Sequence, residues 1–291
     1  MTTVGFIGLG IMGGPMAGHL VTAGHEVIGF DVVPESLTRL ADAGGKAAGS
    51  VAEAVASAEV VITMLPNHPH VESVVLGSDG VLANAAEGTL LIDMSTIRPE
   101  SSLAIAEAAK AKQIRVLDAP VSGGEAGAKG ASLSIMVGGE AADFEAAKPL
   151  FDVLGKTVVH VGPHGAGQVV KAANQLVVGG TYALVAEAIV LLEASGVDAG
   201  TGLDVLAGGL AASRILDLKR ETMVARQFAP GFRIDLHHKD MGIALAAARQ
   251  AGVSLPVTGL VAQLVAAARA MGHGGLDHSA LLKVTEALSG R

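Results

Sequence analysis

Short apolar runs alternate with helical patterns along the first half of the chain. The runs are residues 4–7, 25–30, 60–65, 90–94 and 115–118, with two later ones at 132–137 and 157–161. They are rich in Val, Ile and Leu, which is typical of strands buried on both faces. Stretches with helical spacing, such as 15–23, 101–112 and 143–154, separate them. Strand, helix, strand in repetition predicts an α/β fold with a doubly wound parallel sheet.

After Gly162 and Pro163 this alternation stops. From Gly165 onward the pattern is helical throughout, with breaks at Gly196, 208–209, 230–231, Gly252 and 272–275. A chain of 291 residues is also longer than one core usually supports. We therefore expect two domains, residues 1–163 and an all-helical substrate and oligomerisation domain over 164–291.

A glycine-rich loop joins the first predicted strand to the first helix. Its members are Gly8, Gly10, Ile11, Met12 and Gly13, in the pattern G-x-G-x-x-G. The first glycine makes the tight turn, the second lets the backbone approach a pyrophosphate, and the third packs helix on strand. The helix N-terminus then favours the anion. The loop predicts that residues 1–163 form a Rossmann-type dinucleotide-binding domain.

Asp31, at the end of the second predicted strand, bears on the choice of cofactor. A carboxylate there accepts hydrogen bonds from the adenosine ribose hydroxyls and repels a 2′-phosphate. Val32 and Val33 follow, so no adjacent Arg offers that phosphate a partner. NAD is therefore favoured over NADP.

One cation stands alone in a long apolar stretch of the second half. Lys171 is the only Lys or Arg between residues 166 and 196. Burying an ammonium costs free energy, so a buried lysine usually has a function. Burial also lowers the pKa of a lysine, which makes it a usable proton donor at neutral pH. Asn174 follows three residues later, on the same face of a helix. The pattern predicts an active site here.

The loops that end the parallel strands supply further candidates, because ligands bind beyond the carboxyl ends of such strands. Met64, Leu65 and Pro66 would pass beside the adenosine or its diphosphate, and Thr96, after Ser95, would lie near the nicotinamide ribose. Ser122, Gly123 and Gly124 offer a hydroxyl and unobstructed backbone N–H groups, which suit a carboxylate. Asp93 and Asp118 also end strands, where we expect them to cap the following turns.

Composition narrows the classes of partner. The net charge of −8 and an aromatic content of 2% argue against a nucleic-acid surface. The absence of cysteine excludes disulfides, thiolate catalysis and zinc ribbons. The histidine groups at 68–70 and 237–238 lack carboxylates at matching spacing, so we expect no metal.

Hydropathy raises the question of a membrane. The best candidate, residues 176–192, holds two glycines and Glu187 and falls short of about 20 apolar residues. A helix that is apolar nearly all round is more simply a buried one. We expect no membrane span and a homodimer or homotetramer. The first strand begins near Thr3, which leaves no room for a signal peptide and predicts a cytoplasmic protein.

Three separated stretches carry a family resemblance. Residues 5–13 (GFIGLGIMG), 118–124 (DAPVSGG) and 165–174 (GAGQVVKAAN) together resemble the β-hydroxyacid dehydrogenase family over essentially the whole chain. Stretches 63–71 (TMLPNHPHV), 230–236 (PGFRIDL) and 277–281 (DHSAL) look like its tartronate semialdehyde reductase branch.

The resemblance implies roles for individual residues. Lys171 would be catalytic, and Thr96 and Lys239 would contact the cofactor. The substrate would be held by Ser122, Gly123, Gly124 and Asn174. Some relatives carry a second Asn where this chain has Gln175, so either amide could touch the substrate.

The implied activity is NADH-dependent reduction of a small 3-oxo acid, such as tartronate semialdehyde, to D-glycerate. A 3-hydroxyisobutyrate or succinic semialdehyde type of dehydrogenase stays open. A 6-phosphogluconate type of decarboxylase would need basic residues for a sugar phosphate. A non-catalytic dinucleotide-sensing scaffold is the alternative of another class, and Lys171 speaks against it.

Overall fold

The computed structural model describes residues 1–291, which form two compact units, Met1–Lys171 and Ala172–Arg291. The division falls within one long helix, α9 (Ala166–Ala194), and so lies a few residues beyond the expected limit at 163.

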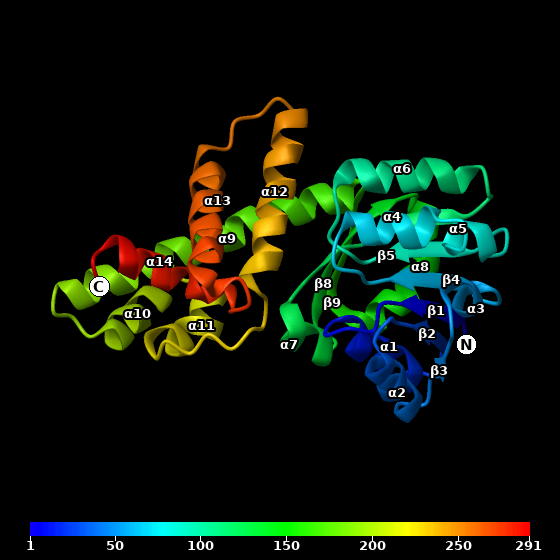
Figure 1. Ribbon diagram of the computed structural model, residues 1–291, viewed down its shortest axis with the longest axis horizontal. Helices are drawn as coiled ribbons and strands as arrows, with labels where there is room; N and C mark the ends of the chain where they lie inside the picture. Colours follow the sequence, from blue (N-terminus) through cyan, green and yellow to red (C-terminus); the bar gives the residue numbers. More distant parts are fainter. The chain divides into compact units, whose positions relative to one another are not determined.

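The first unit has the predicted order of strands and helices (Figure 1). Its elements are β1 Thr3–Ile7, α1 Gly13–Thr22, β2 Glu26–Phe30, α2 Pro34–Asp42, β3 Lys46–Ala47, α3 Val51–Val55, β4 Val60–Thr63, α4 His68–Leu76, α5 Val81–Asn84, β5 Leu90–Asp93, α6 Pro99–Lys110, β6 Arg115–Asp118, β7 Val121–Ser122, α7 Gly124–Lys129, β8 Leu133–Gly139, α8 Ala141–Leu154 and β9 Gly155–Gly162. The two-residue strands β3 and β7 were not expected, because two residues carry no periodic pattern.

The strands form one sheet in the order β3-β2-β1-β4-β5-β6-β8-β7, with β9 also paired to β8. All pairs from β3 to β6 are parallel, as predicted. β8 departs from this, since it runs antiparallel to β6 and β7. The ten residues that separate β7 from β8 are too few for the crossover that a parallel pair needs.

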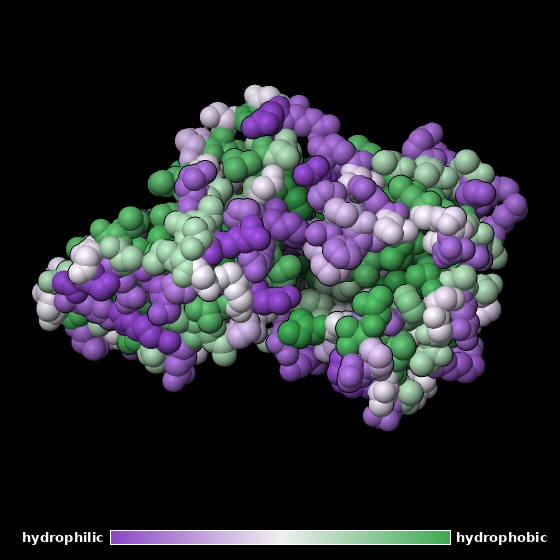
Figure 2. Space-filling model, in the orientation of Figure 1, coloured by the Kyte–Doolittle hydropathy of each residue, from purple (hydrophilic) through white to green (hydrophobic).

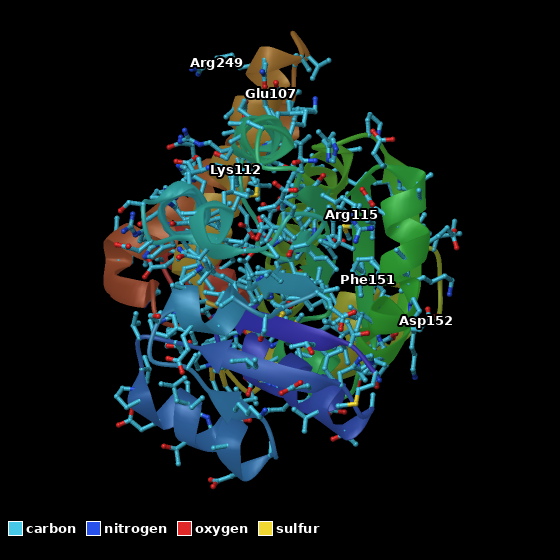
Figure 3. The ribbon with its side chains drawn as sticks, turned by 90° about the vertical axis from the view of Figure 1, so that its right-hand side faces the viewer. Glu107, Lys112, Arg115, Phe151, Asp152 and Arg249 are labelled. Carbon is cyan, nitrogen blue, oxygen red and sulfur yellow. The ribbon has the colours of Figure 1, made fainter.

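Each face of the sheet carries its own core. On one face α1, α2 and α8 pack against strand residues such as Phe6 and Ile62. On the other, α3 to α6 cover the alternate residues, such as Ile7 and Val61. On α8, Phe151 packs into the first of these cores, whereas its neighbour Asp152 reaches the outer surface (Figure 3). A sheet covered on both faces explains why its strands are almost entirely apolar.

The second unit is all helical, as expected. After the remainder of α9 come α10 Ala199–Ala207, α11 Arg214–Val224, α12 Ile234–Gln250, α13 Pro256–Ala268, a π-helical segment Arg269–His273, a 3-10 turn His278–Ala280 and α14 Leu281–Leu288. The predicted breaks at Gly196, 208–209, 230–231 and Gly252 fall between these helices, and the one at 272–275 overlaps the π-helical segment. Gly272 has a φ of 85° in the π-helical segment, a conformation that favours glycine.

α9 contains residues 176–192, the stretch that was considered as a possible membrane span. It is long and apolar enough to span a bilayer, with a mean hydropathy of 1.8, but 44% of that window is buried inside the protein. Its inward residues, such as Ala186 and Ile189, belong to the core of the helical unit. The same properties are typical of the core helix of a soluble protein. Apolar side chains nevertheless reach the surface over both units (Figure 2).

Candidate functional site

The glycine loop between β1 and α1 is shaped by close backbone contacts. Gly8 has a φ of 96°, and a Cβ there would collide with the carbonyl oxygen of Met64. A Cβ on Gly13 would collide with the carbonyl oxygen of Gly8. At Gly10 a Cβ would meet nothing within 4 Å. The protein's own packing thus requires the outer glycines, whereas the middle one leaves a stretch of backbone bare for a ligand to approach.

The start of α1 suits an anion. No acidic residue lies in its first turn, and no side chain caps it. The first N–H groups of a helix have no intrahelical partner, and the helix dipole adds positive potential there. Ile11, in the loop before this helix, is 61% exposed, and Met12 packs partly against the core.

Asp31 lies directly after β2 and faces the glycine loop between β1 and α1. One carboxylate oxygen accepts a hydrogen bond from the backbone N–H of Leu9 at 2.6 Å, and the other accepts from Val33 at 2.8 Å. Each carboxylate oxygen can accept a second bond, so capacity for a ribose hydroxyl remains. Asp31 therefore also holds the glycine loop in place, a role the sequence pattern did not reveal.

The ends of β4 and β5 are joined by a buried polar network. Asp93 accepts hydrogen bonds from the Thr63 hydroxyl at 2.7 Å and from the backbone N–H of Ser95 at 3.2 Å. The Ser95 hydroxyl accepts one from the backbone N–H of Leu65 at 2.9 Å. Asp93 thus caps its own turn, as expected. These bonds hold Leu65, between Met64 and Pro66, beside the loop that carries the half-buried Thr96.

Asp118, at the end of β6, does not serve the turn that follows it, so that expectation was wrong. Its carboxylate accepts hydrogen bonds from the backbone N–H groups of Gly165, at 2.7 Å, and Gln168, at 3.0 Å, at the start of α9. Gly167 and Gly138 leave room for it, because a Cβ on either would lie within 2.8 Å of a carboxylate oxygen. Burial outweighs these bonds and raises the pKa of Asp118 to about 6.

Gln168 ties the same helix start to the loop after β5. Its side-chain amide donates to the carbonyl of Ser95 at 2.9 Å, and its oxygen accepts from the backbone N–H of Ile97 at 3.0 Å. The side chain is 1% exposed. Lys171 follows one turn later on α9 and is 5% exposed, as its setting in the sequence predicted. The first turn of α9 is therefore held on two strand ends immediately before the lysine.

Three of the residues predicted to hold the substrate follow one another where β7 ends and α7 begins. Ser122 is the last residue of β7, and Gly124 is the first of α7. Gly123 and Gly124 have φ values of 138° and 59°, which favour glycine. The binding of a substrate carboxylate by this loop stays a prediction.

In the helical unit, Asn174 and Lys239 are joined through two buried residues. The Asn174 amide donates to the oxygen of Gln175 at 2.8 Å, and Gln175 donates to Asp240 at 2.7 Å. The other oxygen of Asp240 lies 3.1 Å from the Lys239 ammonium. Gln175 is 4% exposed, whereas Asn174 is only half-buried. The amide more accessible to a ligand is that of Asn174.

Two of the family-like stretches contact each other through Asp277. Its carboxylate accepts hydrogen bonds from the backbone N–H groups of Gly231, at 2.9 Å, and Phe232, at 3.1 Å, and from Lys219 at 3.0 Å. Burial alone would raise the pKa of Asp277, but His278, the Ser279 hydroxyl and Lys219 outweigh it and lower the pKa to about 2. His237 belongs to one of the histidine groups considered above as metal ligands. It is fully buried against His278, with 3.0 Å between their Nδ1 atoms.

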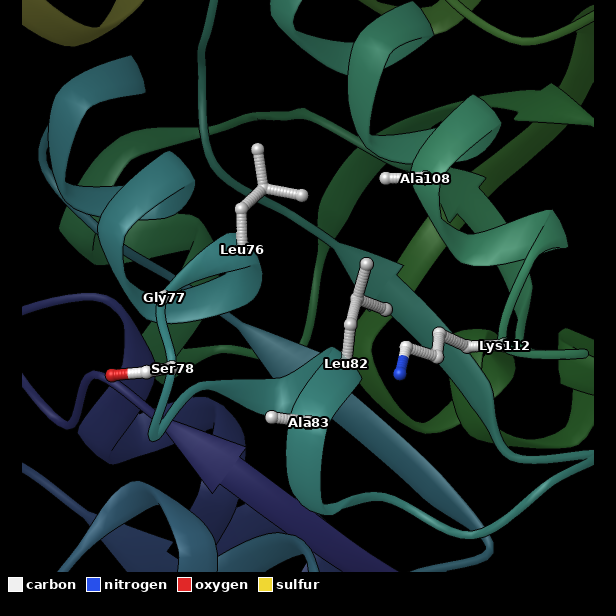
Figure 4. Close-up of a pocket in the computed structure, with 7 residues that line it drawn as sticks. All are labelled: Leu76, Gly77, Ser78, Leu82, Ala83, Ala108 and Lys112. Carbon is white, nitrogen blue, oxygen red and sulfur yellow. The ribbon is translucent and has the colours of Figure 1, made fainter.

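A surface hollow of about 460 Å³ lies elsewhere on the first unit (Figure 4). It is lined by Leu76, Gly77, Ser78, Leu82, Ala83, Ala108 and Lys112. These residues come from the end of α4, from α5 and from the end of α6, which place the hollow at the amino edge of the parallel strands. The glycine loop and Ser122 lie at carboxyl ends, so the hollow is separate from the candidate site.

Sequence reasoning missed Asp118, Gln168 and Asp240 as members of the site. Their partners lie 47 to 73 residues away along the chain. Two signals existed: Gln168 lies inside one of the family-like stretches, and Asp118 is the first residue of another. Neither signal identifies the partner.

Comparison with known proteins agrees with this arrangement. A family model for the NAD-binding domain of 6-phosphogluconate dehydrogenase matches residues 3–162, and one for the NAD-binding region of NADP-dependent 3-hydroxyisobutyrate dehydrogenase matches residues 165–285. The chain is 41% identical to 3-hydroxyisobutyrate dehydrogenase of Pseudomonas aeruginosa, with 98% of each chain covered. It is 41% identical to 2-hydroxy-3-oxopropionate reductase of Escherichia coli, again with 98% of each covered.

A solved structure of a relative has the same fold. Mycobacterium tuberculosis 3-hydroxyisobutyrate dehydrogenase, solved with L-serine, superposes with a TM-score of 0.88 at 37% identity, covering 97% of this chain and 98% of that one. The chain therefore belongs to the 3-hydroxyisobutyrate dehydrogenase-like β-hydroxyacid dehydrogenases, a family of NAD(P)-dependent oxidoreductases.

Proposed function

We propose that this enzyme uses NADH to reduce a small 3-oxo acid, such as tartronate semialdehyde, to the hydroxy acid, with Lys171 as the general acid. The observation that carries the proposal is the placing of Lys171. It is a buried cation one turn beyond Gln168, and Gln168 is hydrogen-bonded to the loop after β5.

The residues around the glycine loop fit a dinucleotide. The bare backbone at Gly10 and the uncapped start of α1 suit a pyrophosphate, and Asp31 retains acceptor capacity for ribose hydroxyls. The two residues after Asp31 are valines, so the chain offers no adjacent cation for a 2′-phosphate. This supports NAD over NADP. When bound, the nicotinamide supplies the hydride that reduces the carbonyl carbon.

The protein's contribution is to orient the substrate and move a proton. Ser122 and the N–H groups at Gly123 and Gly124 hold the substrate carboxylate, and Asn174 holds a polar group of the same small molecule. The Lys171 ammonium donates a proton to the oxygen that becomes the new hydroxyl, and in the reverse reaction the neutral amine accepts it. Positioned proton transfer of this kind contributes about 10²–10⁴-fold in rate.

The choice of substrate rests on the likeness of three stretches, residues 63–71, 230–236 and 277–281, to the tartronate semialdehyde reductase branch. A 3-hydroxyisobutyrate dehydrogenase is the second candidate. The relatives named 3-hydroxyisobutyrate dehydrogenase and 2-hydroxy-3-oxopropionate (tartronate semialdehyde) reductase are both 41% identical to the chain. On the carbon next to the carboxylate, tartronate semialdehyde carries a hydroxyl group, whereas 3-hydroxyisobutyrate carries a methyl group.

A substrate panel tests the proposal. The purified enzyme is assayed by nicotinamide absorbance with tartronate semialdehyde, succinic semialdehyde, 3-hydroxyisobutyrate and related 3-hydroxy acids, each with NAD(H) and NADP(H). We expect the highest kcat/KM with tartronate semialdehyde and NADH. A higher value with 3-hydroxyisobutyrate would select the second candidate, and no turnover with any of these compounds would overturn the proposed substrate class.

Two further parts of the proposal concern the state of the protein in the cell. We propose a cytoplasmic enzyme, in keeping with a long apolar helix whose inward residues belong to the core of the helical unit. We also propose a homo-oligomer, because large apolar side chains remain exposed on the helical unit.

A further inference from the structure

His237 of α12 packs against α9 at the backbone of Gln175. Its Nε2 atom lies 3.2 Å from the carbonyl oxygen of Gln175, and the side chain is fully buried. α9 has a glycine at the point of contact, and a Cβ on Gly179 would lie 3.0 Å from the same nitrogen. The ring of His237 therefore occupies a place that α9 leaves open by lacking a side chain there.

The partners of His237 determine which of its nitrogens carries a proton. A carbonyl oxygen only accepts, so Nε2 is the donor toward Gln175. Nδ1 lies 3.0 Å from Nδ1 of His278, and one of these two atoms has to donate to the other. The carboxylate of Asp277 attracts positive charge on the ring of His278, which favours a proton on its Nδ1. His278 then donates, and His237 is neutral with its proton on Nε2.

Aromatic rings enclose the donor of this pair. The ring centroid of His278 lies 3.9 Å from that of Tyr182 and 5.2 Å from that of Phe232. The backbone N–H of Phe232 is itself bound to Asp277, the residue before His278. His278 is therefore held in the orientation in which it meets His237.

α12 holds Gln175 by two different groups. His237 contacts its backbone carbonyl, and Asp240 accepts a hydrogen bond from its side-chain amide at 2.7 Å. Residues three apart lie on one face of a helix, so both contacts come from the same side of α12. The oxygen of the Gln175 side chain accepts from the amide of Asn174 at 2.8 Å. The orientation of the Asn174 amide thus depends on α12 through Gln175.

We infer that His237 is a positioning residue, which holds α9 at Gln175 so that the amide of Asn174 meets the substrate. The inference rests on the proposed function, in which Asn174 holds a polar group of the substrate. Lys239, the proposed cofactor contact, lies between His237 and Asp240 in the sequence. The same two contacts therefore also set the distance between the proposed substrate contact and the proposed cofactor contact.

The asparagine side chains give a test that needs no turnover. The chain has three asparagines, Asn67, Asn84 and Asn174, so protein labelled with ¹⁵N-asparagine shows the side-chain amides of these residues alone in a nuclear magnetic resonance spectrum. We expect His237→Leu, which removes the donor, to move the Asn174 signal. His237→Gln keeps an N–H that can reach the carbonyl, and should return the signal toward its wild-type position. An Asn174 signal that stays in place in His237→Leu would overturn the inference.

Arg226→Met is the matched control for a general loss of stability in the helical unit. Arg226 binds Glu193 at 2.7 Å and Glu286 at 2.8 Å. Glu193 lies 19 residues beyond Asn174 on α9, about 28 Å along the helix. We expect this variant to melt at a lower temperature and to leave the Asn174 signal unchanged. Equal movement of the signal in Arg226→Met and His237→Leu would show that loosening the unit is sufficient, and would also overturn the inference.

Steady-state kinetics measure the consequence for the reaction, with the substrate that gives the highest kcat/KM. In His237→Leu we expect KM for the acid to rise about tenfold, as for one lost hydrogen bond to the substrate. kcat should stay within about threefold of wild type, because uniform binding is lost rather than the proton donor. His237→Gln should recover most of the affinity. An unchanged KM in His237→Leu would reject the positioning role. A wild type that turns over no substrate would overturn the proposed function, and the asparagine signals would still decide the inference.

Discussion

Gln168 donates a hydrogen bond to the carbonyl of Ser95 at 2.9 Å, and so fastens the helix of the candidate catalytic lysine to the loop after β5. Its amide oxygen accepts from Ile97, two residues further along that loop. The loop between these two contacts carries Thr96, the residue predicted to contact the cofactor. One buried side chain thus sets the distance between the proposed cofactor contact and the proposed proton donor.

Replacing Gln168 should therefore affect both catalysis and stability. Gln168→Met keeps most of the side-chain volume but leaves the Ser95 carbonyl and the Ile97 N–H without their partner, at a cost of about 1–3 kcal/mol each. We expect kcat to fall at least tenfold, because misplacement by about 1 Å can cost 10²-fold. Steady-state kinetics and thermal melting separate the two effects. Gln263→Met, on an exposed position of α13, is the control, and an unchanged kcat in Gln168→Met would reject the positioning role.

Lys171→Ala should lower kcat by about 10²–10⁴-fold, because the new alkoxide would lose its proton donor. Substrate turnover followed by nicotinamide absorbance measures this loss. Lys148→Ala removes an exposed lysine that pairs with Asp152, and should leave kcat unchanged. Retention of more than about a tenth of wild-type turnover in Lys171→Ala would mean that another group supplies the proton.

Asp31 should govern the choice between NADH and NADPH. Asp31→Asn removes the charge but keeps an oxygen that can accept from the Leu9 N–H, so the loop should stay in place while repulsion of a 2′-phosphate disappears. We expect the ratio of kcat/KM for NADH over NADPH to fall at least tenfold. Asp31→Ala should show the same fall with an additional loss of stability, because Leu9 and Val33 lose their acceptor. An unchanged ratio in both variants would show that another residue reads the ribose.

Stability should depend on pH through Asp118. Its pKa rises from 3.8 to about 6 on folding, so the folded state holds this proton more tightly than the unfolded chain does. The free energy of unfolding should therefore decrease as the pH rises from about 4 to about 6, by on the order of 3 kcal/mol from this group alone. Urea denaturation at several pH values measures the slope.

Asp118→Asn supplies the comparison, because an amide does not titrate in this range. The difference in unfolding free energy between wild type and variant should change across the same interval and be constant above it. A difference that stays constant from pH 4 to 6 would show that the carboxyl titrates near its ordinary value.

Much of the first unit could be predicted from the sequence, because its strands are long apolar runs and its helices have regular spacing. β6 was predicted at its observed bounds, Arg115–Asp118, and the other long strands to within about two residues. The direction of β8 was not predicted. Periodicity reports which residues are buried but does not report which neighbour a strand pairs with.

The sequence alone determined the glycine loop, the acidic residue after β2 and the isolated Lys171, because each depends on residue type at a local position. The tertiary structure decided what holds them in place. Asp118 accepts a hydrogen bond from Gly165, 47 residues later, at the start of α9, and Gln168 binds a loop more than 70 residues earlier. Contacts of this kind form only when the strands lie side by side, and no local pattern encodes them.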